Sequence, residues 1–231
     1  MRANGGDSMD KDGKRKKQAS KSDGSRPADT EGGDAAEEPR LVALDGDALA
    51  AVDGLLRGRR TVHEFRPELP PRALVDEALD LSRWAPNHKH TTPWRWYRPG
   101  RRTIEKICGL NARTVRQTKG EEAARKKLER WLKLPGWLLL TAPVNEDDPL
   151  RHQEDYAACC CAAQNFMLAL WARGIGSKWS TGPVTRHPEL YQLLGIDPMA
   201  EHVVGIFWYG FPAQLMEGRR EPLEKSVIDR P

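Results

Sequence analysis

Three clusters of polar residues in the sequence have the composition of ligand-binding sites, and the first is the run Arg59-Arg60-Thr61-Val62-His63. Two guanidinium groups and a hydroxyl suit a phosphate, because arginine presents a bidentate fork that matches phosphate oxygens. The alternative is a solvated basic end of a helix, where the helix dipole favours positive side chains. The run alone leaves both interpretations open.

The second cluster is a polar loop over 85–94, which contains Asn87, His88, His90 and Thr92. The two histidines could be metal ligands, but no third ligand follows at a recognisable spacing. Loops commonly position hydrogen-bond donors around an organic ligand, and we favour that interpretation here.

The third cluster, over 174–182, combines glycines with Trp179, Ser180 and Thr181. Glycines let a backbone approach a ligand closely. The segment contains neither the G-x-G-x-x-G pattern of dinucleotide-binding folds nor the phosphate loop of nucleoside triphosphatases. The chain also lacks a Gly-x-Ser-x-Gly elbow, which argues against a serine hydrolase.

Other reactive side chains are interpreted as structural. The run His152-Gln153-Glu154-Asp155 lies at a predicted helix start, where acidic residues are favoured. Cys108 stands alone and the other cysteines are consecutive over 159–161, so they build no disulfide framework. The three adjacent cysteines are predicted to be small core residues, and the cysteine pattern favours a cytoplasmic protein. Trp131 is either a lid aromatic or a packing residue of a helix.

The elements that position these clusters follow from the spacing of apolar residues. Strands are predicted over 94–98, 137–142 and 202–210. Strands separated by helices, with no repeated βαβ unit, indicate an α+β fold. Helices are predicted after Asp45 and after Pro71, over 101–117, 120–133 and 151–173, and after Pro188.

Two of these helices have distinctive apolar faces. The first helix places Leu49, Val52 and Leu56 on one side. The helix over 151–173 is predicted to be buried on more than one side, because its apolar face is wide: it comprises Tyr156, Ala157, Cys160, Cys161, Gln164, Met167, Leu168 and Trp171.

Composition divides the 231-residue chain into two parts. Residues 1–40 contain no Val, Ile, Leu, aromatic residue or Cys, and their charges balance, so they are predicted to be a disordered charged tail. Residues 41–231 hold every aromatic residue and are predicted to form one domain. A formal net charge of +4 does not predict nucleic-acid binding. No apolar run is long enough for a membrane span, and the first residues contain no secretory signal.

Taken in order, the clusters resemble the FMN-dependent nitroreductase family over about residues 50–230. The matching motifs are Arg59-Arg60-Thr61 for the usual R-R-S and the loop from Ala85 to Trp94 for the usual A-P-S…Q-P-W. Further matches are Ala163-Gln164-Asn165 followed by Gly174 to Trp179, and the run Arg220-Glu221-Pro222-Leu223-Glu224. The resemblance implies an α+β sandwich with a mostly antiparallel sheet flanked by helices. It also implies a homodimer that binds FMN at its interface, with a C-terminal extension that embraces the partner.

The resemblance carries roles onto particular residues. Arg59 and Thr61 match the positions that hold the FMN phosphate and ribityl chain, and Arg60 is adjacent to them. Arg220 matches a C-terminal arginine on the same phosphate. His63 matches a position usually held by Lys or Arg near the flavin ring. That departure predicts a flavin potential that varies with pH, since histidine titrates near neutrality.

The remaining site residues belong to the second and third clusters. His88 and Thr92 match loop positions that contact the flavin from the partner subunit, and Asn87 belongs to the same motif. Thr92 replaces the usual Gln or Asn. The segment from Trp179 through Ser180 to Thr181 matches the backbone that lines the ring.

The implied activity is hydride transfer from NADH or NADPH to flavin N5, followed by reduction of a nitroaromatic, quinone or similar electron-poor acceptor. The flavin carries this chemistry, so no catalytic protein side chain is predicted. Two alternatives keep the fold: a module that binds or sequesters flavin, and a flavin-fragmenting or dehalogenating branch of the superfamily. The sequence does not distinguish NADH from NADPH.

Overall fold

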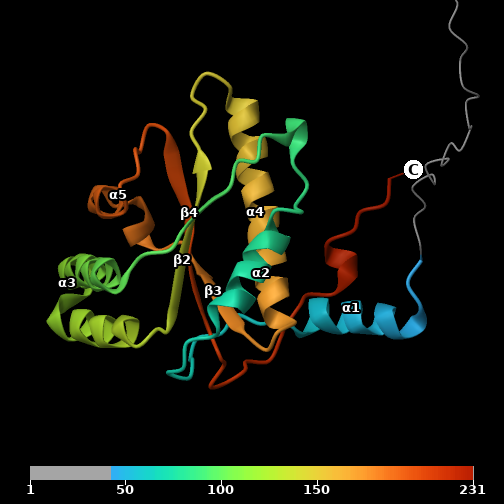
Figure 1. The fold of residues 1–231 in the computed structure, drawn as a ribbon, viewed down its shortest axis with the longest axis horizontal. Helices are drawn as coiled ribbons and strands as arrows, with labels where there is room; N and C mark the ends of the chain where they lie inside the picture. The colour runs from blue at the N-terminus through green and yellow to red at the C-terminus, as the bar shows by residue number, and fades with distance from the viewer. Residues whose placement is uncertain (1–42, 231) are drawn as a thin grey trace, which may run out of the picture. The chain divides into compact units, whose positions relative to one another are not determined.

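A four-stranded antiparallel sheet with strand order β1-β2-β4-β3 forms the centre of the molecule (Figure 1). Its strands are β1 (Arg95–Tyr97), β2 (Gly136–Pro143), β3 (Gly176–Ser180) and β4 (Glu201–Gly210). The computed structural model describes residues 43–230, so the charged tail predicted for 1–40 lies outside the described residues.

The two central strands, β2 and β4, are buried on both faces, as their nearly continuous apolar sequences require. Successive side chains of a strand point to opposite faces. Leu138 and Leu140 therefore enter one core, and Leu139 enters the other together with Ile206 of β4. A bulge between Leu140 and Thr141 shifts the register between the two strands.

Helices cover both faces of the sheet, which confirms the predicted α+β sandwich (Figure 1). On one face lie α2 (Arg72–Ser82) and α4 (Pro149–Trp171). On the other lie α3 (Arg101–Leu132) and α5 (Pro188–Leu194). The predicted break in α3 is a kink at Gly120, whose φ of 82° suits a glycine. Within residues 43–230, no helix is long and apolar enough to cross a membrane.

Shorter elements complete the described chain. The first helix is α1 (Gly46–Gly58), and Asp45 caps it by accepting a hydrogen bond from the Ala48 N–H. Three 3₁₀ turns are η1 (His88–His90), η2 (Pro183–Arg186) and η3 (Leu223–Lys225). The last of these lies in the C-terminal arm, residues 211–230, which otherwise contains no helix.

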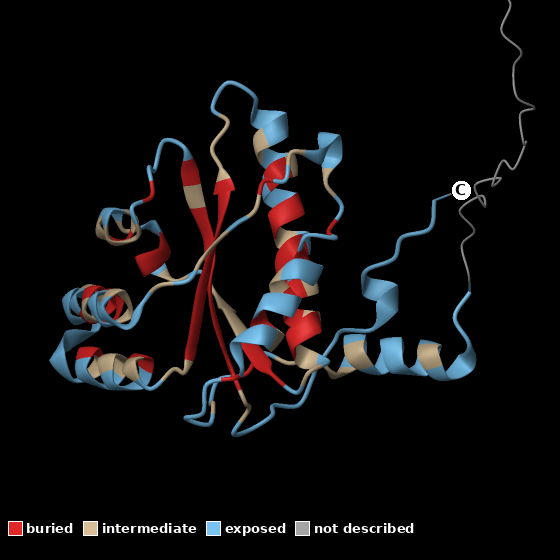
Figure 2. Ribbon diagram, in the orientation of Figure 1, coloured by how far each residue is buried: buried red, intermediate tan, exposed pale blue. Residues whose placement is uncertain are grey.

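The burial predicted for α4 is wrong about which side is covered (Figure 2). Tyr156, Ala157, Cys161 and Gln164 are exposed. The buried residues are mostly small and face the sheet and α2; they are Asp155, Ala158, Cys159, Ala162, Ala163, Phe166, Met167, Ala169 and Leu170. Because α4 is apolar on nearly every side, periodicity alone could not select the side that packs.

Two further expectations are settled by packing. Trp131 is buried against Trp137 and Trp208, so it is a core residue and not a lid. Cys159 is buried, as predicted for the run 159–161, but the prediction is wrong for Cys161, which is exposed because it lies on the outer side of α4. Cys108 is also buried.

Candidate cofactor site

The first and third clusters meet at the edge of the sheet beside β3. Thr61 forms a parallel bridge with Ser177, and the Val62 N–H donates to the Ser177 carbonyl oxygen at 3.0 Å. Val62 is buried, whereas Thr61 and His63 on either side of it are exposed. This alternation is that of a short edge strand, and it displays Thr61 and His63 on the face away from the core.

Arginines from both ends of the described chain converge at this edge. Burial of the Arg59 guanidinium lowers its pKa, and the positive charges of Arg220 and Arg60 lower it further. The C-terminal arm passes closely over Arg60, since a Cβ atom on Gly218 would lie 2.3 Å from its Cζ. Within residues 43–230, none of these three arginines forms an ion pair. Such a cluster suits an anion with several oxygens, such as a phosphate.

His63 has a basic neighbour that the sequence did not single out. The Nζ of Lys178 lies 3.2 Å from the Nδ1 of His63. The pKa of His63 is lowered by burial and then by the charges of Lys178 and Arg130, while Glu64 opposes the shift. The charge of Lys178 therefore favours a neutral His63. The alternation of side chains along β3 could have identified Lys178 in the sequence, because it places Lys178 on the face of the strand opposite Trp179.

The side chain of Trp179 is half-buried and packs against the core. Its ring stacks on Phe207 at 5.3 Å, and its Nε1 donates to the Val204 carbonyl oxygen at 3.2 Å. Ser180 pairs with Ile206 at the end of β3, and Thr181 is exposed just beyond it. The backbone of this segment and the exposed side chain of Thr181 are therefore the groups that can contact a ligand.

Asn87 holds the loop over 85–94 together through hydrogen bonds within the loop. Its Oδ1 accepts from the Thr92 N–H at 2.7 Å, and its Nδ2 donates to Thr91 Oγ1 at 2.9 Å. Lys89, His90 and Thr92 adopt positive φ angles, which non-glycine residues rarely do. Strained backbone of this kind is typical of functional loops, where the surrounding structure enforces it.

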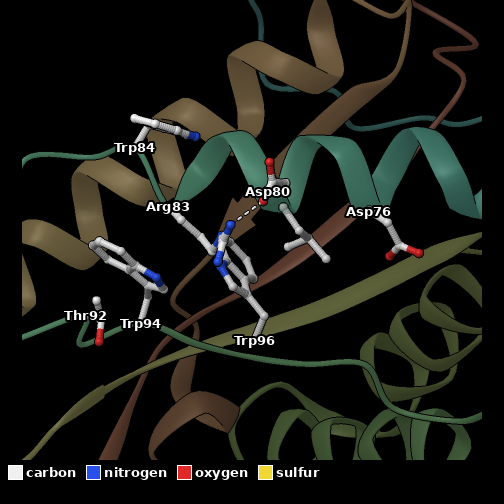
Figure 3. A pocket seen from close by; sticks show the side chains of 8 residues that line it. Asp76, Asp80, Arg83, Trp84, Thr92, Trp94 and Trp96 are labelled. Atoms are coloured by element: carbon white, nitrogen blue, oxygen red, sulfur yellow. Dashed lines mark hydrogen bonds and ion pairs between the residues drawn. The ribbon is translucent and has the colours of Figure 1, made fainter. Parts of the chain in front are cut away.

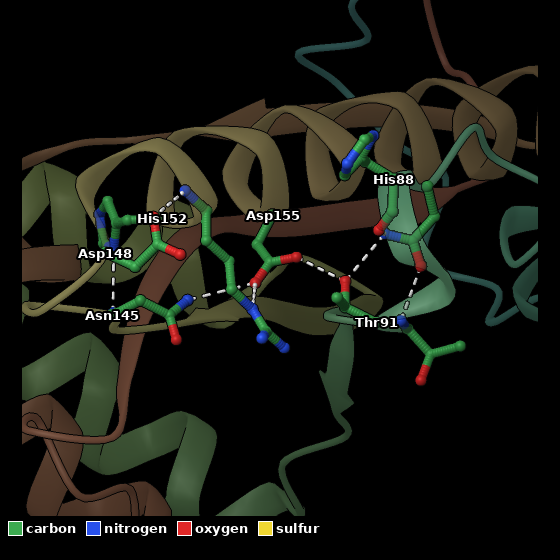
Figure 4. Close-up of polar contacts among 9 residues, drawn as sticks. His88, Thr91, Asn145, Asp148, His152 and Asp155 are labelled. Carbon is green, nitrogen blue, oxygen red and sulfur yellow. Dashed lines mark hydrogen bonds and ion pairs between the residues drawn. The ribbon is translucent and has the colours of Figure 1, made fainter.

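Asp155 of α4 anchors this loop, although sequence reasoning assigned it only a helix-start role. It is buried, accepts from Thr91 Oγ1 at 2.5 Å and from Asn145 Nδ2 at 3.2 Å, and lies 3.6 Å from Arg151 Nε (Figure 4). His88 and Thr92 remain exposed. No local pattern marks a partner 64 residues away.

The loop and the arginines lie at opposite ends of α4 within one chain. Asp155, which holds the loop, is near the start of the helix, whereas Trp171 at its end lies against Gly58, next to Arg59. The 16 helical steps between Asp155 and Trp171 correspond to about 24 Å. The structure therefore brings together Arg59, Arg60, Thr61, His63, Arg220 and the 179–181 segment, but not Asn87, His88 and Thr92.

A cavity of about 780 Å³ lies between α2 and β1, next to this loop (Figure 3). Its residues are Asp76, Leu79, Asp80, Arg83, Trp84, Thr92, Trp94 and Trp96. Trp84 is 80% exposed, which is unusual for an aromatic side chain of this size. None of the three converging arginines lines this cavity. Within one chain, Thr92 therefore faces a cavity that the arginines do not reach.

Residues 56–211 match the family model described as the Nitroreductase family. Because that match covers more than half of the chain, the protein belongs to this family. Family membership agrees with the fold and with the order of the motifs along the chain.

Known relatives resemble most of the described chain. A protein of Bacillus subtilis (strain 168) named as a candidate NAD(P)H nitroreductase, YfhC, is 26% identical over 76% of this chain and 92% of its own length. A crystal structure of a nitroreductase-like family protein from Bacillus cereus superposes with a TM-score of 0.68 at 26% identity, covering 83% of this chain and 99% of that one. The FMN-dependent nitroreductase NfnB from Mycobacterium smegmatis, solved with NADPH, shares the fold at 17% identity and a TM-score of 0.64, covering 80% and 100% of the two chains.

Proposed function

We propose that the protein is a homodimeric, FMN-dependent oxidoreductase that uses NAD(P)H to reduce nitroaromatics, quinones or similar electron-poor acceptors. The observation that carries this proposal is the convergence of Arg59, Arg60 and Arg220 without an acidic partner among the described residues. A dianionic phosphate neutralises such a cluster. Membership in the nitroreductase family and the names of the relatives support FMN as the owner of that phosphate.

The residues at the basic edge fit FMN. The three arginines would hold its phosphate, and the exposed hydroxyl of Thr61 would donate to the phosphate or the ribityl chain. His63 and the 179–181 segment lie further along the same edge, where the ring would lie. When bound, FMN supplies hydride acceptance from NAD(P)H and electron delivery to the acceptor, so these side chains only bind, orient and tune.

A second subunit completes the site in this proposal. His88 and Thr92 are too far from Arg59 to contact the same small ligand within one chain, because most of the length of α4 separates them. The same residues of a partner can reach it. Exposed apolar residues on α1, on the outer side of α4 and along the C-terminal arm are suited to such an interface; they include Leu49, Val52, Leu56, Tyr156, Leu215, Met216, Leu223, Val227 and Ile228.

A cytoplasmic location completes the proposal. All four cysteines lie among the described residues and are unpaired. Free thiols are typical of reducing compartments.

The decisive experiment uses the purified full-length protein under nitrogen. We expect a yellow protein whose flavin absorbance bleaches on addition of NADPH or NADH and recovers when a nitroaromatic or a quinone is added. A protein that binds flavin but is not bleached would be a flavin-binding module instead. Consumption of the flavin itself under air would indicate the flavin-fragmenting branch, and release of halide from a halogenated aromatic would indicate the dehalogenating branch. A colourless protein that cannot be reconstituted with FMN would contradict the proposal.

A further inference from the structure

A second group of basic side chains lies where β3 faces the last turns of α3. Lys178 Nζ is 3.2 Å from His63 Nδ1 and 5.4 Å from the centre of the Trp208 ring. Lys127 Nζ lies 5.7 Å from the Trp131 ring, whose centre is 4.9 Å from that of Trp208. Both lysines thus rest on one tryptophan cluster, which limits the positions of their charges. We define the basic cluster as His63, Lys127, Arg130 and Lys178.

No ion pair among residues 43–230 neutralises the basic cluster. Neighbouring α3 residues are paired with acids: Arg125 with Glu122 and Glu129, and Lys126 with Glu122. Lys127 and Arg130 form no ion pair within residues 43–230. The helix therefore neutralises the cations on its outer side and leaves those facing β3 free.

Gathering these charges is unfavourable in the absence of an anion. Burial lowers the pKa of Lys178, and the charges of Arg130 and Lys127 lower it further. Burial and the charge of Arg130 likewise lower the pKa of Lys127. Cations held together against mutual repulsion and desolvation are a signature of a functional site, because a bound anion removes the penalty.

The basic cluster is distinct from the arginines that would hold the FMN phosphate. His63 is four positions after Arg59, and four residue steps of extended chain span about 13 Å. FMN has a single phosphate, which the proposed function assigns to Arg59, Arg60 and Arg220. Its ring gains at most one negative charge on reduction, whereas the basic cluster holds three basic side chains besides His63, namely Lys127, Arg130 and Lys178. The excess charge is suited to a second, more highly charged ligand.

We propose that the basic cluster is the subsite for a phosphate of the nicotinamide donor, an inference that rests on the proposed function. NADH carries a pyrophosphate and NADPH carries an additional 2′-phosphate, so both supply the required chemistry. A neutral nitroaromatic or quinone supplies none. The cluster lies beside the expected position of the flavin ring, which leaves the donor's nicotinamide free to reach the ring while its phosphates contact α3.

The test measures binding of donor fragments that cannot transfer a hydride. Isothermal titration of the FMN-loaded protein with 2′-phospho-ADP-ribose and with ADP-ribose is compared for Lys127→Gln, Arg130→Gln and the control Lys126→Gln. The control removes an equal charge from the adjacent, ion-paired position. We expect each cluster variant to raise the dissociation constant about tenfold, with a steep salt dependence in the native protein, and the control to change it less than twofold.

The two fragments distinguish the two phosphate sources. A loss confined to 2′-phospho-ADP-ribose assigns the 2′-phosphate, whereas an equal loss for both fragments assigns the pyrophosphate. Unchanged affinity in the cluster variants, or an equal loss in Lys126→Gln, would overturn the proposal. In turnover, the same variants should raise the KM for the donor and leave that for a neutral acceptor unchanged; the reverse would also overturn it.

A spectroscopic readout separates this inference from the proposed function. In the FMN-free protein, NMR titration of the His63 ring should give a higher pKa when 2′-phospho-ADP-ribose is present, because a nearby phosphate favours the imidazolium. An unchanged His63 pKa would contradict the subsite even if FMN binds. Failure of the protein to bind FMN would contradict the proposed function, whatever the His63 result.

Discussion

The Thr91 hydroxyl donates a hydrogen bond of 2.5 Å to Oδ1 of Asp155, and this contact ties the 85–94 loop to the start of α4. The arginines near residue 59 lie at the other end of the same helix. The two halves of the expected flavin site are thereby fixed about one helix length apart in a single chain. In the proposed dimer, the loop of one subunit and the arginines of the other would together form one site.

Removal of the Asp155 carboxylate should destabilise the 85–94 loop and weaken flavin binding. Asp155→Ala leaves Thr91 and Asn145 without their acceptor, which should lower the free energy of unfolding by about 1–3 kcal/mol. Urea denaturation measures that loss, and flavin absorbance after gel filtration measures retained FMN. The control is Glu154→Ala, at the adjacent and less buried position. Equal effects of both substitutions would contradict the anchoring role.

The converging arginines should contribute to FMN binding but not to the stability of the FMN-free protein. Arg59→Ala and Arg220→Ala should each raise the FMN dissociation constant about tenfold or more, since each removes a charge-assisted contact to the phosphate. Arg220→Ala should not destabilise the FMN-free protein, because the charge of Arg220 repels that of Arg59. Fluorescence titration with FMN checks the first expectation and thermal denaturation the second. Arg57→Ala, on the exposed end of α1, should change neither.

Gly205 is needed to seat Trp179. A Cβ at Gly205 would lie 2.1 Å from Trp179 Nε1, so Gly205→Ala must displace that ring from Phe207 and from its hydrogen bond to Val204. We expect a loss of about 1–3 kcal/mol in the free energy of unfolding, accompanied by weaker FMN binding. Gly109→Ala in α3 meets only ordinary contact and should be neutral or stabilising. A Gly205→Ala protein as stable as the native one would contradict this packing.

His202 should make the protein less stable in mild acid. Burial lowers its pKa below 6.5, the charge of His152 lowers it further, and its Nδ1 is buried without a hydrogen-bond partner in the described structure. Below pH 6.5 the unfolded chain therefore binds more protons than the folded one, and stability falls as the pH falls toward the folded-state pKa. His202→Gln should flatten this decline in urea denaturation between pH 5 and pH 7.5. His63 shifts in the same direction, so some slope should remain; an unaltered slope would exclude His202 as a source.

A charge on the outer side of α4 should separate the proposed subunits. Ala157 is exposed in the single chain, and Ala157→Arg would bury an unpaired charge in the expected interface. Light scattering should then report the 26.0 kDa chain instead of twice that mass, and FMN should be lost together with the dimer. Gln117→Arg on the exposed side of α3 is the matched control. A dimeric Ala157→Arg protein that keeps its FMN would place the interface elsewhere.

Sequence periodicity predicted most elements because it reflects local physics. The continuous apolar runs predicted β2 and β4 within one or two residues, and the two helical segments predicted over 101–117 and 120–133 agree with the kink that interrupts α3. The motifs also identified the basic run at 59–63 and the matching arginine at 220. These features depend on residue types that are close in sequence, where backbone propensity and side-chain spacing act.

Only the tertiary structure decided which of these features meet and which side of α4 is buried. Lys178 lies beside His63, Arg220 influences Arg59, and Asp155 holds Thr91, yet each pair is separated by at least 64 residues. The strand order and the close approach of small α4 residues to the sheet set these contacts. Nothing in the local pattern encodes them, because a contact between distant residues depends on how complete elements pack.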